Sequence, residues 1–169
     1  MPEFARTPPP RTNLSVGLTA VAPTGQYDPA RVINLGSHRW SFKPEGAITR
    51  TNGRWMVEFY GGVWLFTAND ELQVTHTQTR EPLLSTQLNL RYTFKPSLWI
   101  SANANYYTGG RTTVDGRANS DLQTNSRLGT TLSVPLGNRS SIRFAVSDGA
   151  YTTIGGDFLG LSMSFQRVF

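Results

Sequence analysis

The chain has 169 residues, enough for one domain or part of one, and its apolar content of 38% is low for a soluble globule. The absence of cysteine excludes a disulfide scaffold and a Cys-based zinc site. The net charge of +5 comes from basic residues scattered singly, without a Lys/Arg run or stripe, so we expect no nucleic-acid partner. No apolar run reaches the roughly 18 residues that a transmembrane helix needs.

Residues 1–12 are rich in proline and predict a linker or disordered lead-in, which leaves residues 13–169 as the folded domain. The lead-in lacks the apolar core and cleavage site of a signal peptide. Farther along, apolar and polar residues alternate, and a period of two places each set on one face of a β-strand. Eight strands are predicted in this way, at residues 13–22, 40–49, 55–67, 83–94, 98–107, 123–136, 140–147 and 158–169.

The clearest two strands are joined by Lys95-Pro96-Ser97, which is too short for anything but a hairpin turn. Before this turn Leu88 and Leu90 alternate with Asn89 and Arg91. Each strand has roughly ten residues, the length that crosses a bilayer when tilted. The pattern therefore predicts a long antiparallel hairpin that is apolar on one side and rich in amides on the other.

The connections between the predicted strands alternate strictly between long and short. Such alternation is typical of a transmembrane barrel with long external loops and short periplasmic turns. An aqueous lumen also accepts Ser, Thr, Asn, Gln and Arg, whereas a packed core would have to pair each of them. We therefore predict an all-β fold, an antiparallel transmembrane β-barrel with both chain ends on the periplasmic side. The long connections are residues 23–39, 68–82, 109–121 and 148–157.

Aromatic residues lie near the strand ends, as the interface girdles of such a barrel require. They are Trp40, Trp55, Tyr92, Phe94, Tyr106 and Phe169. The final Phe169 is in register with Phe165 and resembles the C-terminal signal of outer-membrane barrels. The expected partners are therefore outer-membrane lipid and, through the last strand, the barrel-assembly machinery.

The polar parity carries charges that a barrel would turn inward, namely Lys43, Glu45, Glu58, Arg91, Arg127 and Arg143. They predict either a charged constriction that sets solute selectivity or internal ion pairs that satisfy one another. The inward parity of residues 55–67 also carries three large aromatic rings, Tyr60, Trp64 and Phe66. This stripe predicts either a slide for aromatic solutes or packing under an inward-folded loop.

No enzyme chemistry is predicted. His38 and His76 lie in long loops without a second histidine or a carboxylate cluster at ligand spacing, and we expect them to be solvated. Asp115 and Asp121 are expected to be loop carboxylates rather than calcium ligands. Gly109-Gly110-Arg111 lacks the following helix of a phosphate cradle and predicts a strand-end turn. We therefore expect no catalytic residue, metal ion or cofactor.

Several strings resemble the outer-membrane protein family named for the meta pathway of phenol degradation, over roughly residues 13–169. The most specific is Arg39-Trp40-Ser41-Phe42-Lys43-Pro44-Glu45. Others are residues 25–29, 33–36, 109–116, 126–129 and 135–136. The resemblance implies a barrel in a Gram-negative outer membrane that passively passes small hydrophobic or aromatic compounds.

Members of that family are longer, with a signal peptide and further strands upstream. The inward side chains are also bulky for an eight-stranded lumen, which is just wide enough for side chains to fill. We therefore expect this chain to be the C-terminal part of a larger barrel. Two alternatives stay open: a structural, adhesive or enzymatic membrane barrel, and a soluble lipocalin-like barrel. The lipocalin would need an apolar interior, whereas the alternate face here is polar.

Overall fold

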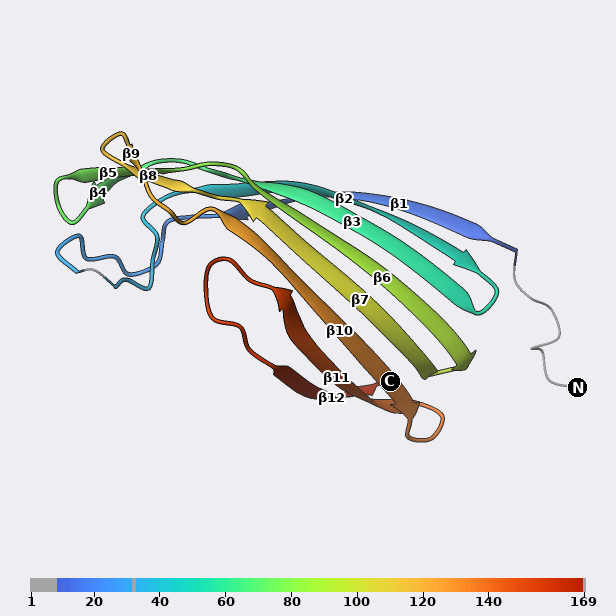
Figure 1. Cartoon of the computed structure of the whole chain (residues 1–169). Coiled ribbons are helices and arrows are strands. Elements are labelled where there is room, and N and C mark those ends of the chain that lie inside the picture. The colour runs from blue at the N-terminus through green and yellow to red at the C-terminus, as the bar shows by residue number, and fades with distance from the viewer. Residues whose placement is uncertain (1–8, 32, 169) are drawn as a thin grey trace, which may run out of the picture.

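The structure is a computed structural model that describes residues 9–31 and 33–168, and these residues form strands without a helix. Eight long strands make one antiparallel sheet in the order β1-β2-β3-β6-β7-β10-β11-β12 (Figure 1). They are β1 (Arg11–Val21), β2 (Ser41–Asn52), β3 (Trp55–Phe66), β6 (Leu83–Lys95), β7 (Leu98–Gly109), β10 (Gln123–Pro135), β11 (Ser140–Tyr151) and β12 (Gly160–Arg167). The all-β class and the eight predicted strands are confirmed.

Several strand ends differ from the prediction, and the largest difference is in β11, which runs four residues past its predicted end at residue 147 to Tyr151. β1 begins at Arg11, so the last two residues of the predicted lead-in belong to the sheet, and residues 1–8 of that lead-in lie outside the described residues. β2 runs on to Asn52, because the tight turn at Gly53 lets both strands of the hairpin continue to the turn itself. Pro44 lies inside β2, between β1 and β3, and the ladder to β3 is interrupted at residues 43 and 44. The interruption follows from the N–H that proline lacks.

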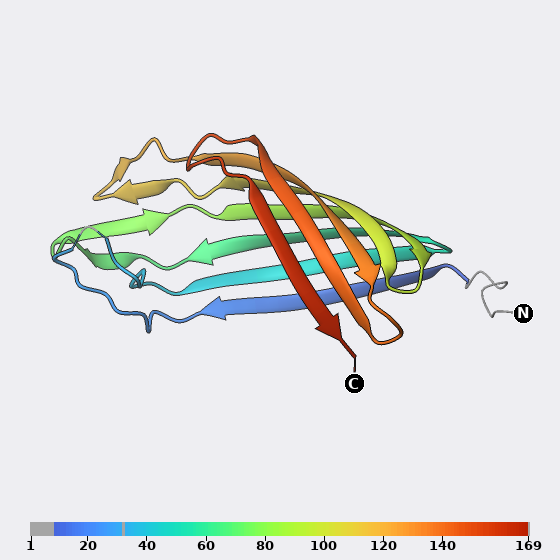
Figure 2. The ribbon, with the colours of Figure 1, turned by 90° about the horizontal axis from the view of Figure 1, so that it is seen from below.

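The sheet is curved, and its last strands turn back beneath the others (Figures 1 and 2). It is an open sheet rather than a closed cylinder, with β1 and β12 as its two edges in the described chain. The short turns β2–β3, β6–β7 and β10–β11 lie at one end, and the long connections lie at the other. The predicted alternation of long and short connections is therefore confirmed.

Strand register sorts the side chains onto two faces. Leu132 of β10 pairs with Ile100 on one side and Phe144 on the other, while the neighbouring Thr131 pairs with Ser101 and Ala145. We call the side that carries Leu132 the apolar face and the side that carries Thr131 the polar face. Side chains of the apolar face are exposed, as Phe144 is by 46%. Those of the polar face are mostly half-buried in the inner strands, as on the concave side of a curved sheet.

The described residues contain almost no hydrophobic core, since Leu83 is their one buried hydrophobic side chain. Large apolar side chains are exposed instead, and they include Leu14, Val16, Leu88, Leu128, Leu161 and Met163. Every strand of the large sheet from β1 to β12 contributes to this exposed apolar face. The apolar interior that a lipocalin-like barrel requires is therefore not built by this part of the chain.

The predicted aromatic positions lie near the sheet ends. Trp55 is 4.8 Å from Tyr92 and Tyr92 is 5.0 Å from Phe94, measured between ring centroids. Trp40 and Tyr106 are exposed. Such a rim is the position in which aromatic rings meet a membrane interface. Phe169 lies outside the described residues.

A second sheet of four short strands was not predicted. Its order is β4-β5-β8-β9, and it is built from the two long connections that follow β3 and β7. Its strands are β4 (Asn69–Leu72), β5 (His76–Arg80), β8 (Thr112–Val114) and β9 (Arg117–Ala118). Segments of two to five residues are too short for an alternating pattern to reveal them. The connections at residues 68–82 and 109–121 are thus partly strands rather than loops throughout.

Candidate functional site

The predicted inward residues of the large sheet all belong to its polar face. Lys43 and Glu45 come from β2, and Glu58, Tyr60, Trp64 and Phe66 come from β3. Arg91, Arg127 and Arg143 come from β6, β10 and β11. Register brings Tyr60 opposite Ala47 and Gln87, and it brings Arg127 opposite Asn105. Whether this face lines a lumen stays a prediction.

Lys43 and Glu45 compensate each other. The Lys43 Nζ lies 2.8 Å from the Glu45 Oε2, and the Tyr60 hydroxyl donates a hydrogen bond to the same carboxylate. The ammonium also lies 5.3 Å from the ring centroid of Tyr60 and 4.9 Å from that of Trp64. Neighbouring positions on one strand face thus form a closed cluster. For this pair, the ion-pair alternative describes the geometry.

Glu58 is held by neutral groups. Its Oε2 accepts a hydrogen bond of 2.9 Å from the Thr49 hydroxyl, and its Oε1 accepts one of 2.9 Å from the Asn89 amide. Asn89 in turn accepts a hydrogen bond of 2.9 Å from Gln87. Within the described residues no Lys, Arg or His nitrogen lies within the 4.0 Å of an ion pair with Glu58. The chain of amides therefore fixes this carboxylate without neutralising it.

The three predicted arginines are not paired with Glu45 or Glu58. Arg91 and Arg143 both approach Trp99, with their guanidinium carbons 5.6 and 5.4 Å from the ring centroid. Arg127 lies 3.9 Å from the ring centroid of Phe158 and donates to the carbonyls of Phe158 and Ser147 at 2.8 and 3.3 Å. The predicted alternative of mutual ion pairs is therefore wrong for these arginines.

Trp99 was missed by the sequence analysis. It has the polar parity of β7, because it pairs with Thr93 on one side and Ser133 on the other. That parity could have been read from Ser101 and Asn103, which follow at spacings of two. Its contact with Arg143 could not have been read, because both residues pair with Ser133 of β10, and this register between three strands is not visible in any single strand.

Phe66 closes the aromatic stripe at the long-loop end. Its ring lies 6.4 Å from that of Trp64 between centroids, and it faces the guanidinium groups of Arg39 and Arg80 at 5.7 and 4.8 Å. Arg80 belongs to β5, so the small sheet packs on this ring, as the inward-loop alternative expected. Burial, and then the neighbouring charge of Arg80, lowers the pKa of Arg39 from its ordinary value. Phe66 therefore lies close to two guanidinium groups, whereas Tyr60 and Trp64 lie close to the Lys43 ammonium.

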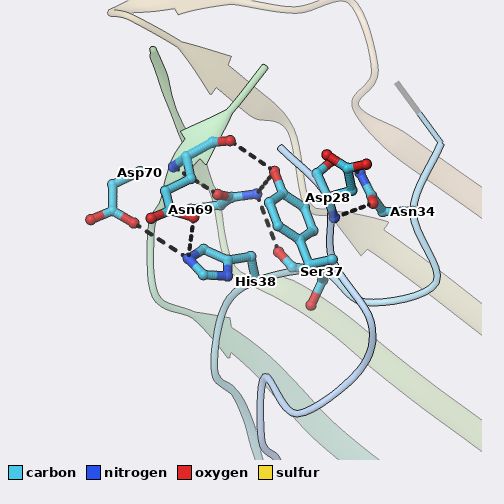
Figure 3. Close-up of polar contacts among 8 residues, drawn as sticks. Asp28, Asn34, Ser37, His38, Asn69 and Asp70 are labelled. Atoms are coloured by element: carbon cyan, nitrogen blue, oxygen red, sulfur yellow. Dashed lines mark hydrogen bonds and ion pairs between the residues drawn. The ribbon is translucent and has the colours of Figure 1, made fainter. Parts of the chain in front are cut away.

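His38 organises the connection between β1 and β2. Its ring stacks on Tyr27 at 4.8 Å between centroids, and its Nε2 lies 3.4 Å from a Glu71 carboxylate oxygen and 4.0 Å from one of Asp70 (Figure 3). Asn69 donates to the Tyr27 hydroxyl at 3.0 Å and to the Ser37 carbonyl at 3.3 Å. The expectation of a solvated histidine without nearby carboxylates is wrong here, because β4 brings Asp70 and Glu71 to it.

His76 joins β5 to the turn after β8. Its Nδ1 lies 2.5 Å from the Oδ2 of Asp115. The other carboxylate oxygen of Asp115, Oδ1, accepts a hydrogen bond of 2.9 Å from the Thr77 N–H. These contacts, that of Thr77 first, lower the pKa of Asp115. This histidine, too, has a carboxylate partner that its sequence spacing did not reveal. The two carboxylates act as the expected loop carboxylates, since Asp121 likewise caps β8 by accepting from Thr112 N–H and hydroxyl at 2.9 and 2.6 Å.

Gly109 and Gly110 end β7 with φ angles of 108° and 69°, as a strand-end turn requires. Within residues 9–31 and 33–168, no group of three or more His, Cys, Asp or Glu side chains is arranged to hold a metal ion. No helix long and apolar enough to span a bilayer occurs among the described residues.

A family model described as "Putative MetA-pathway of phenol degradation" matches residues 4–163. Among solved structures, the chain is similar to an outer membrane channel from Pseudomonas putida F1, with a TM-score of 0.81 and 21% sequence identity. The match covers 94% of this chain and 60% of the channel's chain, so the sequence spans about three fifths of that protein's length. No curated protein matches the sequence.

Proposed function

Because the chain belongs to the family of the MetA pathway of phenol degradation, we propose that it forms a channel wall in a bacterial outer membrane. Solutes would pass along the polar face without a cofactor or a chemical step. Lipid would cover the apolar face, and the assembly machinery would receive the sheet through β12. The family resemblance found from Arg39-Trp40-Ser41-Phe42-Lys43-Pro44-Glu45 agrees with the family model.

One observation carries this proposal: the exposed apolar face extends over all eight strands of the large sheet. Soluble monomers rarely expose a contiguous apolar patch of more than a few hundred Å². Leu18, Leu88 and Leu161 come from the first, fourth and last strands, and they are 69%, 49% and 75% exposed. Lipid is the surrounding in which such a face is stable. The inner strands of the large sheet have 12 or 13 residues, which is long enough to cross a bilayer.

We propose small hydrophobic or aromatic compounds as the solutes. Support comes from the rings of Tyr60 and Trp64, which lie on the polar face beside the Lys43 ammonium. A row of rings and cations offers stacking and cation–π contacts to an aromatic solute, and it does so without a strong binding site. Weak, repeated contacts suit passage better than tight binding, since a channel must release what it admits.

Channel activity is tested with the intact protein reconstituted in planar bilayers and in liposomes. We expect discrete conductance steps, and we expect liposomes to swell faster with phenyl glucoside than with a disaccharide. W64L should slow phenyl glucoside more than twofold, whereas W40L, which alters an exposed tryptophan at the rim, should not. Absence of conductance and swelling from correctly folded protein would reject the channel. Equal effects of the two variants would reject the aromatic path alone.

A further inference from the structure

We propose that a small pocket at the short-turn end of the polar face binds the carboxylate group of small organic anions. The pocket has a volume of about 130 Å³. It is lined by Ser97, Trp99, Ser133, Asn138, Arg139, Ser140, Ser141, Arg143, Gln166 and Val168. This inference rests on the proposed channel, and it assigns a class of solute to one place along the path.

The pocket is built by adjacent rungs of four neighbouring strands. Trp99 of β7 pairs with Ser133 of β10, and Ser133 pairs with Arg143 of β11. Two residues before Arg143 on the same strand, Ser141 pairs with Gln166 of β12. Because paired residues point to the same side of a sheet, these side chains gather on the polar face. Ser133 is only 1% exposed, so the floor of this pocket is densely packed.

Positive charge gathers here, and within residues 9–31 and 33–168 no carboxylate side chain compensates it. Arg143 and, from the β10–β11 turn, Arg139 line the pocket, while Arg91 lies beside the same Trp99 ring without lining it. Arg143 donates to the side-chain oxygen of Gln166, a neutral group. In the described chain, none of the three arginines lies within 4.0 Å of an Asp or Glu oxygen. This arrangement attracts an anion, since neighbouring guanidinium groups repel one another until a negative charge joins them.

Two guanidinium nitrogens have unused donor capacity. The Nε atoms of Arg91 and Arg143 are buried and have no hydrogen-bond partner. A buried donor without a partner costs on the order of 1–3 kcal/mol, more when the group is charged. A carboxylate presents two acceptor oxygens in the planar geometry that matches a guanidinium, and the guanidinium groups that line the pocket are those of Arg139 and Arg143.

The remaining lining selects the size of the anion. Amide and hydroxyl groups of Asn138, Ser140 and Ser141 provide neutral donors around the arginines. A volume of about 130 Å³ is roughly that of four liquid waters, enough for a carboxylate and a few attached carbons. The Trp99 ring borders the same pocket and provides an apolar surface for those carbons. We therefore assign the site to small organic carboxylates.

The test measures block of channel current by benzoate in planar bilayers formed with the intact protein. Benzamide, which has the same ring without the charge, serves as the control ligand. R91Q/R143Q should raise the half-blocking benzoate concentration at least tenfold. The matched variant R54Q/K95Q removes two exposed charges from turns at the same end of the sheet and should change it less than twofold. Equal block by benzamide, or equal effects of the two double variants, would overturn the proposal.

A second measurement separates failure of this site from failure of the channel. Benzoate should quench the tryptophan fluorescence of the intact protein in detergent, and W99F should remove this change. Chloride at equal concentration should not compete; competition would mean a simple anion site and would overturn the carboxylate assignment. Folding of R91Q/R143Q is judged by heat-modifiable gel mobility. If that variant does not fold, R139Q replaces it, because Arg139 lies in the turn between β10 and β11, where a substitution disturbs the sheet less. Undiminished quenching in folded R139Q would then reject the pocket.

Discussion

Asp115 fastens the turn after β8 to the neighbouring strand β5. It receives the Thr77 N–H at 2.9 Å and the His76 ring at 2.5 Å, and both partners are almost 40 residues away in sequence. These hydrogen bonds lower the pKa of Asp115, because they favour its ionised form. One carboxylate therefore adds two side-chain bonds to the backbone pairing of β5 with β8, and these bonds are strongest while it is ionised.

The small sheet should loosen in acid before the large sheet does. A carboxyl whose pKa is lowered by folding stabilises the fold above its ordinary pKa of about 3.8, and this stabilisation is lost as the pH falls through the lowered value. We expect pepsin cleavage within residues 110–121 to accelerate as the pH is lowered below about 4. Peptide mapping against pH measures this rate.

Removal of the charge provides the control at neutral pH. D115N should speed trypsin cleavage at the exposed Arg117, because the contacts with Thr77 and His76 are weakened in all conditions. E81Q removes a carboxylate from an exposed side chain of the neighbouring connection, between β5 and β6, and should leave the rate unchanged. A wild-type-like cleavage rate in D115N would show that Asp115 does not hold this turn.

Two neighbouring residues of β12 test the assignment of the faces. Met163 lies on the apolar face at mid-strand and is 69% exposed, while Ser162 lies on the polar face. M163R should lower the free energy of unfolding in lipid by about 2–4 kcal/mol, since an arginine at the bilayer midplane must leave water. S162R should cost much less, because its side chain points to the aqueous side. Urea refolding titrations in vesicles compare them, and equal losses would mean that the apolar face does not meet lipid.

At the scale of single elements, the β6–β7 hairpin depends on the conformation of Ser97. Its φ of 61° is left-handed, a conformation that costs a residue with a side chain roughly 1–2 kcal/mol. Glycine avoids this cost but loses about 0.5–1 kcal/mol through its freedom in the unfolded chain. S97G should therefore stabilise the protein by about 0.5–1 kcal/mol. S101G, within β7 and without a positive φ, should destabilise it by a similar amount in the same urea titration; stabilisation by both would refute the explanation.

The difference between the two sheets explains how much could be predicted from the sequence. In β6 and β7 the alternation extends over more than ten residues, so existence, parity and turn were all predictable. The pairing of β5 with β8 involves five- and three-residue strands, with Arg80 opposite Thr112, and no local pattern marks it. The partners of His38 and His76 depend on this second sheet, and their surroundings were therefore unpredictable.

For the charges of the polar face, too, local features were predictable and contacts between distant strands were not. Parity placed Lys43, Glu45 and Arg143 on one face, because parity is local. Which of them would meet depended on distance: Lys43 and Glu45 are two residues apart and pair, whereas Arg143 reaches Trp99 across β10. This contact depends on the register of three strands, since Arg143 and Trp99 both pair with Ser133, and single-strand patterns carry no information about register.

At the scale of the whole molecule, the two edges of the large sheet lie open. β1 and β12 each pair on one side alone within the described residues. In a membrane every unpaired backbone N–H and C=O costs several kcal/mol, so a spanning sheet has to close. Closure of β1 onto β12 would produce an eight-stranded cylinder whose interior side chains just fill. The interior would have to hold Trp64, Trp99 and the arginines of the polar face together.

A barrel with more than eight strands has a wider interior and avoids this crowding. We therefore predict that further strands, rather than the pairing of β1 with β12, complete the barrel. The bulky polar-face side chains, among them Trp64, Trp99 and Arg143, are the reason for this prediction. The cysteine-free sequence permits a direct test by oxidative cross-linking. V146C/L161C joins paired positions of β11 and β12 and should cross-link readily. V16C/M163C, at mid-strand in β1 and β12, should not cross-link within one molecule of the intact protein in lipid, and rapid formation of that bond would establish an eight-stranded barrel instead.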